Sequence, residues 1–421
     1  MDISDFYNNR EIFITGGTGF LGKSLIEKLL RDCPGIKTIY MLIRTKRGKT
    51  ALERLEDFKN DIVFERVRRE RPNVFEKVVP IFGDCQHLGL AISQEDLERL
   101  KNVSIIFHEA AVVRYTNFYP NAYSFTKNLG EQVIADHSHL LPMTILRPAI
   151  VASAYLEPEP GYLENLNGPM GILAVKSMGI SQMTYANPDL ILSLIPVDIV
   201  TCLTISSGCR SGLETLSKPK NVPYNLHIQT FAPGKLFNST IKQSVHKMVE
   251  LARENPMENT VWAPATRLTT SMYCYLIWVF LFHIPMGIFY DTLLKLSKKQ
   301  PMLLKATRRI IYTIRTIGKF SKIYYEIKND GMFEVFDFMM QHDEKRRFYI
   351  MAPTEVDHDF AFRGALRGLK KFIFKEPVEA TAATRQRVKI LIILDKIVSF
   401  VLFFIVIKFA WNWTMSLVGV M

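Results

Sequence analysis

Tyr123 and Lys127 stand four residues apart in the segment 121–127, NAYSFTK, and a helix over this segment would set both side chains on one face. A phenol titrates at about pH 10, but a neighbouring ammonium stabilises the phenolate and lowers that pKa. The pair therefore predicts a general acid, Tyr123, with Lys127 as the residue that sets its pKa, as in a carbonyl reductase. Because this spacing also occurs by chance in many helices, its weight depends on the segment upstream.

That upstream segment predicts a strand, a tight turn and a helix. Residues 12–22 read IFITGGTGFLG, in which a β-branched and aromatic run breaks into four glycines before a helical repeat begins. The last six residues match G-x-G-x-x-G, whose glycines let the backbone approach a pyrophosphate at the helix N-terminus. A plain glycine turn is the alternative, but the flanking strand and helix favour dinucleotide binding. The residues expected to bind the cofactor here are Thr15, Gly16, Gly17, Thr18, Gly19, Phe20, Leu21 and Gly22.

The next strands would supply the rest of the cofactor site. The strand 38–43 ends at Arg44, about 20 positions beyond the glycines, where an acid selects NAD and an arginine accommodates the 2′-phosphate of NADP. Arg44 therefore favours NADPH, with a solvated basic loop as the alternative. After the strand 103–108, the small residues Ala110 and Ala111 would leave room for the cofactor, whereas His108 is better explained as a packed residue at the strand end.

Charge and cysteine content restrict the partners. The 421 residues carry a formal net charge of +12, which calls for an acidic partner. Many basic residues lie late in the chain beside apolar runs, and no zinc-finger, helix-turn-helix or RNP pattern is present, so we expect anionic membrane lipid and a phosphate-rich cofactor rather than nucleic acid. The five cysteines form no C-x-x-C pair, which favours a reducing compartment without a disulfide framework or a metal site.

Two apolar stretches near the C-terminus could contact a membrane. Residues 272–290 are almost wholly apolar but include His283 and Pro285, and they could line an acyl tunnel, form core or dip into a membrane. Residues 390–421 predict a C-terminal anchor or hairpin, because 397–407 carry no charge and the tryptophans beyond suit an interface. The first ten residues lack an apolar secretory segment, and basic residues at 385–389 precede the anchor, so we expect the catalytic domain to face the cytosol.

At this point the chain resembles an alcohol-forming fatty acyl-CoA reductase, a membrane-attached branch of the extended short-chain dehydrogenase/reductase superfamily. The glycine turn and Tyr123 to Lys127 are shared with other reductases of that superfamily, and the stretch 147–169 is specific to acyl-CoA reductases. The motifs that carry the resemblance are TGGTGFLG at 15–22, YSFTK at 123–127, RPAIV at 147–151, EP at 157–158, PGY at 160–162, NLNGP at 165–169 and IPVD at 195–198.

The resemblance implies two hydride steps with NADPH. A long-chain fatty acyl-CoA would be reduced to a hemithioacetal, CoA would leave, and the aldehyde would be reduced to a fatty alcohol. Tyr123 would be the general acid, and Lys127 would also hold the nicotinamide ribose. The resemblance adds Asp84 for the adenine edge, although a turn role is its alternative, and it adds Arg147 and Pro148 to the cofactor site. Membranes of the endoplasmic reticulum and of the peroxisome are both open as locations.

We therefore predict an α/β fold, a Rossmann-type doubly wound parallel sheet followed by a mostly helical C-terminal domain and a membrane anchor. Further strands are expected at 78–82 and 140–145, and residues 190–200 are expected to form a loop. The expected divisions are a reductase domain over 1–230, a connection over 231–270, a helical domain over 271–375, and a basic linker with the anchor over 376–421.

One departure from the superfamily pattern weakens the catalytic assignment. A strand, a crossover helix and a second parallel strand need about 30 residues, but only 12 positions separate Ala111 from Tyr123. We therefore expect the fifth strand and the catalytic serine to be missing, through a splice variant or an incomplete gene model, with either exposed strand edges or residues 140–145 filling the vacancy. A catalytically impaired NADP-binding homologue, or another extended reductase such as a sterol dehydrogenase, remains an alternative.

Overall fold

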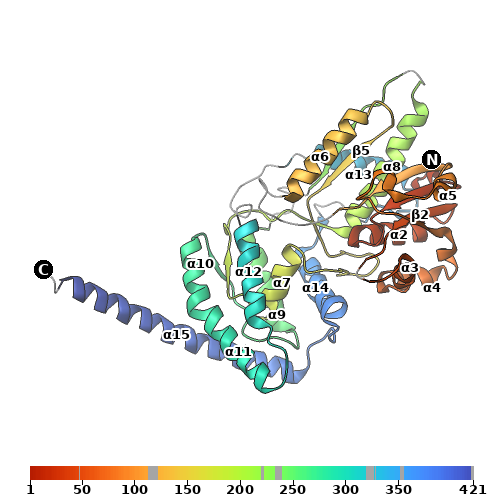
Figure 1. Cartoon of the computed structure of the whole chain (residues 1–421). Coiled ribbons are helices and arrows are strands. Elements are labelled where there is room, and N and C mark those ends of the chain that lie inside the picture. Colours follow the sequence, from red (N-terminus) through yellow and green to blue (C-terminus); the bar gives the residue numbers. More distant parts are fainter. Residues whose placement is uncertain are drawn as a thin grey trace. The chain divides into compact units, whose positions relative to one another are not determined.

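The computed structural model describes residues 1–46, 48–111, 122–219, 222–232, 239–318, 327, 329–350 and 355–418. Its central element is a parallel sheet in the order β3-β2-β1-β4 (Figure 1). The strands are β1 (Glu11–Thr15), β2 (Thr38–Ile43), β3 (Val78–Phe82) and β4 (Val103–His108). This arrangement confirms the predicted Rossmann-type fold, and β2, β3 and β4 have the bounds expected from the sequence.

Apolar runs bury the middle of this sheet on both faces. Ile12 and Ile14 of β1 are fully buried, as parallel strands between two helical layers require. On one face, Phe13, Leu42 and Ile81 form a cluster contributed by three neighbouring strands. On the other face, the long helices α2 and α8 pack against each other.

The sheet stops at β4 in the part of the chain that the structure describes. Strand β5 (Thr144–Pro148) pairs with β9 (His227–Phe231) in a separate two-stranded sheet instead of joining β4. Ile106 in β4 is 64% exposed, which is unusual for an apolar strand residue in an α/β sheet. Of the two outcomes expected from a missing fifth strand, the described residues show the exposed neighbour.

Two further pairs of short strands are parallel. They are β6 (Ile150–Ala152) with β8 (Leu194–Pro196), and β7 (Met183–Tyr185) with β10 (Arg267–Thr269). Two sequence expectations about local structure were wrong. The first is the strand expected at 140–145, which begins at Thr144, because Pro142 lacks a backbone N–H group and the two leucines before it are exposed.

The α-helices make up most of the remaining described chain. The first nine are α1 (Ile3–Phe6), α2 (Phe20–Asp32), α3 (Ala51–Lys59), α4 (Glu65–Glu70), α5 (Gln94–Arg99), α6 (Ala122–His137), α7 (Pro169–Ser177), α8 (Val197–Ser217) and α9 (Ile241–Glu254). The others are α10 (Met272–Trp278), α11 (Ile284–Leu296), α12 (Leu303–Ile317), α13 (Asp330–His342), α14 (His358–Gly368) and α15 (Ala382–Val418). Helix α8 corrects the second expectation, a loop over 190–200, because Pro196 precedes the helix and Asp198 suits its first turn.

Short 3₁₀ and π segments are also present. The 3₁₀ segments are Ile62–Phe64, Val74–Lys77 and Leu88–Ala91, and the π segments are Val279–His283 and Leu369–Phe374.

The chain divides into two compact units built from alternating pieces. The first unit contains residues 1–165, 191–238 and 324–368, and the second contains 166–190, 239–323 and 369–421. Both units are therefore discontinuous in sequence, whereas the four divisions predicted from the sequence are linear, and that functional division stays a prediction. Within the described residues, one helix is long and apolar enough to cross a membrane, Met272–Leu296, with 28% of its apolar window buried.

Candidate functional site

The glycine turn between β1 and α2 has a geometry that only glycine tolerates at two points. Gly16 has φ +74°, and a Cβ there would lie 2.6 Å from the backbone nitrogen of Ala110, just after β4. A Cβ on Gly22 would lie 2.4 Å from the carbonyl oxygen of Gly16. Within the described residues no side chain caps α2 at Gly19, so the first N–H groups of that helix point to an open N-terminus suited to an anion.

An arginine pair lies at the end of β2. The Arg44 guanidinium donates to Oδ2 of Asp84 at 2.9 Å, which brings together two residues assigned to the cofactor from the sequence. Arg54 on α3 donates to the carbonyl oxygen of Arg44 and, at 2.9 Å, to Oγ1 of Thr18 in the glycine turn. Burial and the neighbouring Arg44 lower the pKa of Arg54. The guanidinium groups of Arg44 and Arg54 therefore both lie near the glycine turn. Arg54 was not predicted from the sequence, because it belongs to no recognised motif.

The charge of Lys127 acts on two titratable groups at the end of β4. Burial and the Lys127 ammonium both lower the pKa of His108, whose Nδ1 lies 2.8 Å from Oγ1 of Thr15. Burial raises the pKa of the neighbouring Glu109 carboxyl to about 7, and Lys127 opposes that rise. Glu109 was not foreseen from the sequence. The charge of Lys127 thus acts at the same strand end that meets Gly16, where Ala110 and Ala111 were expected to face the cofactor.

Helix α6 begins at Ala122 and contains both Tyr123 and Lys127, as the sequence predicted. The side chain of Tyr123 lies outside the described part of the structure, so its assignment as the acid stays a prediction. Arg147 on β5 forms an ion pair with Glu131 on α6, with Nε 2.9 Å from Oε1, and Pro148 follows it at an exposed position. The structure therefore engages Arg147 with α6, and its role in cofactor binding, like that of Pro148, stays a prediction.

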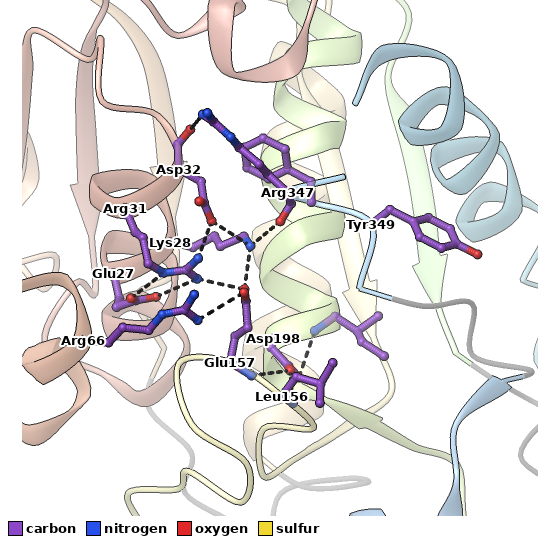
Figure 2. Close-up of polar contacts among 12 residues, drawn as sticks. Glu27, Lys28, Arg31, Asp32, Arg66, Leu156, Glu157, Asp198, Arg347 and Tyr349 are labelled. Carbon is purple, nitrogen blue, oxygen red and sulfur yellow. Dashed lines mark hydrogen bonds and ion pairs between the residues drawn. The ribbon is translucent and has the colours of Figure 1, made fainter. Parts of the chain in front are cut away.

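Asp198 fixes the loop that follows β6. Its two carboxylate oxygens accept hydrogen bonds from the backbone N–H groups of Tyr155, Leu156 and Glu157 at 2.7–3.0 Å. Burial raises the pKa of Asp198 and these backbone donors oppose the rise. Asp198 of the motif at 195–198 therefore holds the backbone at Leu156 and Glu157, as Figure 2 shows.

Glu157 attaches the same loop to α2. Its Oε2 lies 2.6 Å from Lys28 Nζ and 2.8 Å from an Arg31 nitrogen, and Arg66 approaches Oε1 at 3.4 Å (Figure 2). Burial alone would raise the pKa of this carboxyl, but Lys28 and Arg31 override that effect and lower it to about 2. Lys28 also donates to the backbone carbonyl of Arg347. One buried lysine thus joins α2 to two distant segments of the first unit.

Glycines hold the other end of this loop against α14. Gly161 has φ +83°, and a Cβ there would lie 1.9 Å from the carbonyl oxygen of Gly364. A Cβ on Gly368 would lie 1.8 Å from the carbonyl oxygen of Gly161. The side chain of Tyr155 also packs edge-on against Phe360. The motifs at 157–162 therefore contact α2 through Glu157 and α14 through Gly161.

Comparison with known proteins places this geometry in a family. A profile described as male sterility protein, NAD-binding, matches residues 14–122 and 115–204, and a second male sterility profile matches 282–376. Mouse (Mus musculus) fatty acyl-CoA reductase 2 is 28% identical, over 92% of this chain and 89% of that protein. A putative fatty acyl-CoA reductase of Drosophila melanogaster is 27% identical, over 93% of this chain and 91% of that protein.

Solved structures share the fold. The terminal R domain from the myxalamid PKS-NRPS pathway has a TM-score of 0.57 at 17% identity, covering 88% of this chain and 93% of that chain. The reductase domain of a non-ribosomal peptide synthetase from Mycobacterium tuberculosis has a TM-score of 0.56 at 14% identity, covering 88% of this chain and 95% of that chain. At these identities the likeness concerns the fold alone.

The comparisons also bear on the short connection before Tyr123. The Drosophila alignment runs over 479 positions, although 93% of the 421 residues is about 392, so about 87 aligned positions have no counterpart here. The NAD-binding profile matches in two pieces that meet at residues 115–122. This break coincides with the place where the sequence predicted a missing strand. With its NAD-binding and male sterility profiles and these relatives along nearly its whole length, the chain belongs to the fatty acyl-CoA reductase family.

Proposed function

We propose that this protein is an NADPH-dependent reductase that converts a long-chain fatty acyl-CoA to a fatty alcohol and releases CoA. The observation that carries the proposal is the glycine turn with the N-terminus of α2, which no described side chain caps. Arg44 and Arg54 lie beside this turn, and the charge of Lys127 acts on Glu109 at the end of β4. The relatives are named fatty acyl-CoA reductases, which supports the substrate class.

The coenzyme would rest on residues of β1 to β4. The N–H groups at the start of α2 would bind the pyrophosphate, and the backbone of Ala110 and Ala111 would line the inner side of the turn. Arg44 and Arg54 would bind the 2′-phosphate, which supports NADPH over NADH because a phosphate between the two guanidinium groups would relieve their mutual repulsion. Asp84 orients Arg44 through their 2.9 Å ion pair.

Tyr123 and Lys127 would carry the proton chemistry. When bound, the coenzyme supplies hydride to the thioester carbon and, in the second step, to the aldehyde carbon. Tyr123 would donate a proton to the carbonyl oxygen as negative charge develops there, and Lys127 would favour the tyrosinate that remains. The exposed position of Lys127 lets its ammonium approach a ribose as well.

Membrane attachment would bring the enzyme to its lipid substrate. The C-terminal half of α15 exposes large apolar side chains, among them Phe400 at 65% and Phe403 at 60%. This supports α15 as the anchor, with the catalytic unit on the cytosolic side as expected from the basic residues that precede it.

One observation favours a second candidate function, an impaired coenzyme-binding homologue. The described residues leave β4 without a fifth strand beside it, and β5 pairs elsewhere. In that case the protein would bind NADPH without turning over acyl-CoA, because α6 would not hold Tyr123 at the nicotinamide.

A turnover assay separates the two functions. The purified full chain would be mixed with NADPH and palmitoyl-CoA, and NADPH oxidation and free thiol from CoA would be followed together. For an active reductase, Tyr123→Phe lowers turnover by about 100-fold or more while NADPH binding is unchanged, and Tyr224→Phe serves as the matched control. Coenzyme binding with no thiol release in the unmodified chain would refute the reductase and support the impaired homologue.

An insertion variant tests the cause of any impairment. Insertion of a crossover helix and a strand, about 30 residues in all, between Ala111 and Tyr123 should restore turnover and leave the NADPH dissociation constant unchanged. Unchanged inactivity after insertion, in a protein that still binds NADPH, would show that the short connection is not the cause.

A further inference from the structure

The apolar helix 272–296 has a narrow buried stripe and a wide exposed apolar face. Its buried positions recur every three or four residues, which places them along one side of the helix. These buried residues are Tyr275, Val279, Phe282, His283, Gly287 and Asp291. Its exposed apolar face consists of Tyr273, Leu276, Ile277, Phe280, Leu281, Ile288, Phe289, Leu293 and Leu296, which are 42–81% exposed. We call this set the α10–α11 face.

Polar contacts tie the buried stripe to the second unit along its length. The backbone N–H of Gln182 donates to Nε2 of His283 at 3.0 Å. About two turns further on, the Asp291 carboxylate accepts from the backbone N–H groups of Met302, Leu303 and Leu304 at 2.8–3.0 Å. A helix that is bound along one side and apolar along the other has the pattern of a helix that lies in a membrane surface.

A basic helix adjoins the α10–α11 face. The contact at Asp291 caps the start of α12, and the two helices pack so closely that a Cβ on Gly287 would lie 2.7 Å from the Leu304 side chain. The exposed side of α12 carries Lys305, Arg308 and Arg309. From 271 to 318 the chain contains seven lysines and arginines and one acidic residue, the buried Asp291.

The anchor helix leaves the second unit beside this face. Arg267 donates to both Asp395 and Ser399 of α15 at 2.9 Å, and its guanidinium carbon lies 4.9 Å from the Trp278 ring centroid on α10. Before this point α15 contributes buried residues such as Val388, and after it the apolar side chains are exposed. Figure 1 shows the C-terminal part of α15 extending away from α10, α11 and α12.

We propose that the α10–α11 face lies in the plane of an anionic membrane surface, with its apolar side chains at the boundary between headgroups and acyl chains. The basic side of α12 would meet anionic headgroups, and the start of the exposed part of α15 would enter the same leaflet. Apolar depth of about 5–10 Å is typical of such a surface helix. This inference relies on the proposed anchoring by α15 only to bring the protein to the vesicle, and it is independent of turnover.

The chain offers a pair of thiols for the test. Cys274 lies on α10 and is exposed, Cys85 is exposed in the first unit, and the other three cysteines are buried. The full chain would be labelled with a thiol-reactive NBD dye as the Cys85→Ser variant, which reports Cys274, and as the Cys274→Ser variant, which reports Cys85. Both would be reconstituted into vesicles of phosphatidylcholine and phosphatidylserine with nitroxide lipids labelled near the headgroup or near the bilayer centre.

The expected result is a Cys274 probe that is shielded from aqueous iodide and quenched more by the shallow nitroxide than by the deep one. The Cys85 probe should be quenched by iodide and by neither lipid. Iodide quenching of Cys274 equal to that of Cys85 would overturn the proposal, and so would strongest quenching by the deep nitroxide, which indicates a spanning helix. Vesicle flotation reports α15 separately, so a failed anchor and a failed surface contact are distinguishable.

Charge removal tests the role of α12. Lys305→Gln/Arg308→Gln/Arg309→Gln should reduce shallow quenching at Cys274, because each basic residue near an anionic surface favours contact by about fivefold. Lys49→Gln/Arg99→Gln/Lys101→Gln, which removes three exposed charges from the first unit, is the matched control and should change nothing. Equal quenching in both triple variants, with unchanged thermal unfolding, would refute the contribution of α12.

Discussion

The carboxylate of Glu157 is expected to be a major contributor to the stability of the first unit. Its pKa falls from an ordinary 4.5 to about 2 in the folded chain, because Lys28 and Arg31 outweigh the effect of burial. A shift of that size corresponds to about 3 kcal/mol of stability at neutral pH. Glu157→Gln should therefore lower the free energy of unfolding by about 3 kcal/mol at pH 7, measured by urea denaturation followed by far-ultraviolet circular dichroism, because the four tryptophans all lie in the second unit.

The stabilisation by Glu157 should decrease as the pH is lowered. Because the folded pKa is the lower one, the contribution is fully present above the unfolded pKa and is lost as the pH falls through the folded pKa. The difference between the natural chain and Glu157→Gln should shrink to about 1 kcal/mol at pH 3. A difference that is constant with pH would mean that the variant acts through packing and not through charge.

Two comparisons isolate the ion pairs of Glu157. A double-mutant cycle with Lys28→Met should give a coupling energy of about 1–3 kcal/mol, because the two atoms are 2.6 Å apart and the lysine is buried. Asp57→Asn removes a carboxylate from an exposed pair with Lys49 and should cost less than about 1 kcal/mol. Equal costs for Glu157→Gln and Asp57→Asn, or a coupling energy near zero, would refute the reasoning.

Other predictions concern the coenzyme site and the loop beside it. Arg54→Ala should weaken NADPH binding by about 10-fold or more and leave NADH binding unchanged, as measured by fluorescence titration. Asp198→Asn should cost about 2–4 kcal/mol, seen as a lower melting temperature, because three loop N–H groups lose a charged acceptor. Gly16→Ala should abolish NADPH binding because its Cβ would collide with Ala110, whereas Gly48→Ala, at φ +76° with open space around it, should bind NADPH normally.

The parallel sheet could be predicted from the sequence because local signals sufficed. Each of β2, β3 and β4 is a short apolar run bounded by turn residues. A continuous apolar run predicts a strand buried on both faces, even when its neighbours in the sheet are unknown. The start of α8 could not be found this way. Its first turn is stabilised by Asp198, and that residue caps a loop more than forty positions earlier in the chain.

Some residues of the candidate site could likewise be predicted from local sequence patterns, and others could not. The glycine turn and Arg44 follow from spacing along a single βαβ unit. The ion pair between Arg44 and Asp84 was not predicted from the sequence. Arg54, Glu109 and Glu157 act through tertiary contacts that no local pattern encodes. Glu157 meets Lys28 across 129 positions of sequence, so only the fold reveals that the loop containing Glu157 is bound to α2.

The short connection before Tyr123 separates two halves of the expected chemistry. Every residue assigned to the pyrophosphate and the 2′-phosphate lies on β1 to β3 or in the segments that follow them. The described residues include the contacts between Arg44 and Asp84 and between Arg54 and Thr18 of the glycine turn. The proposed acid lies on α6, whose position against the sheet would normally be fixed by the strand and helix that precede it. In this chain α6 is tied to the Arg147 strand, and that strand pairs with β9 instead of β4. In the described residues, the contacts around the proposed coenzyme site therefore do not involve a strand beyond β4, whereas the position of the proposed acid on α6 would depend on such a strand. We therefore expect coenzyme affinity and turnover to respond independently to changes in the short connection.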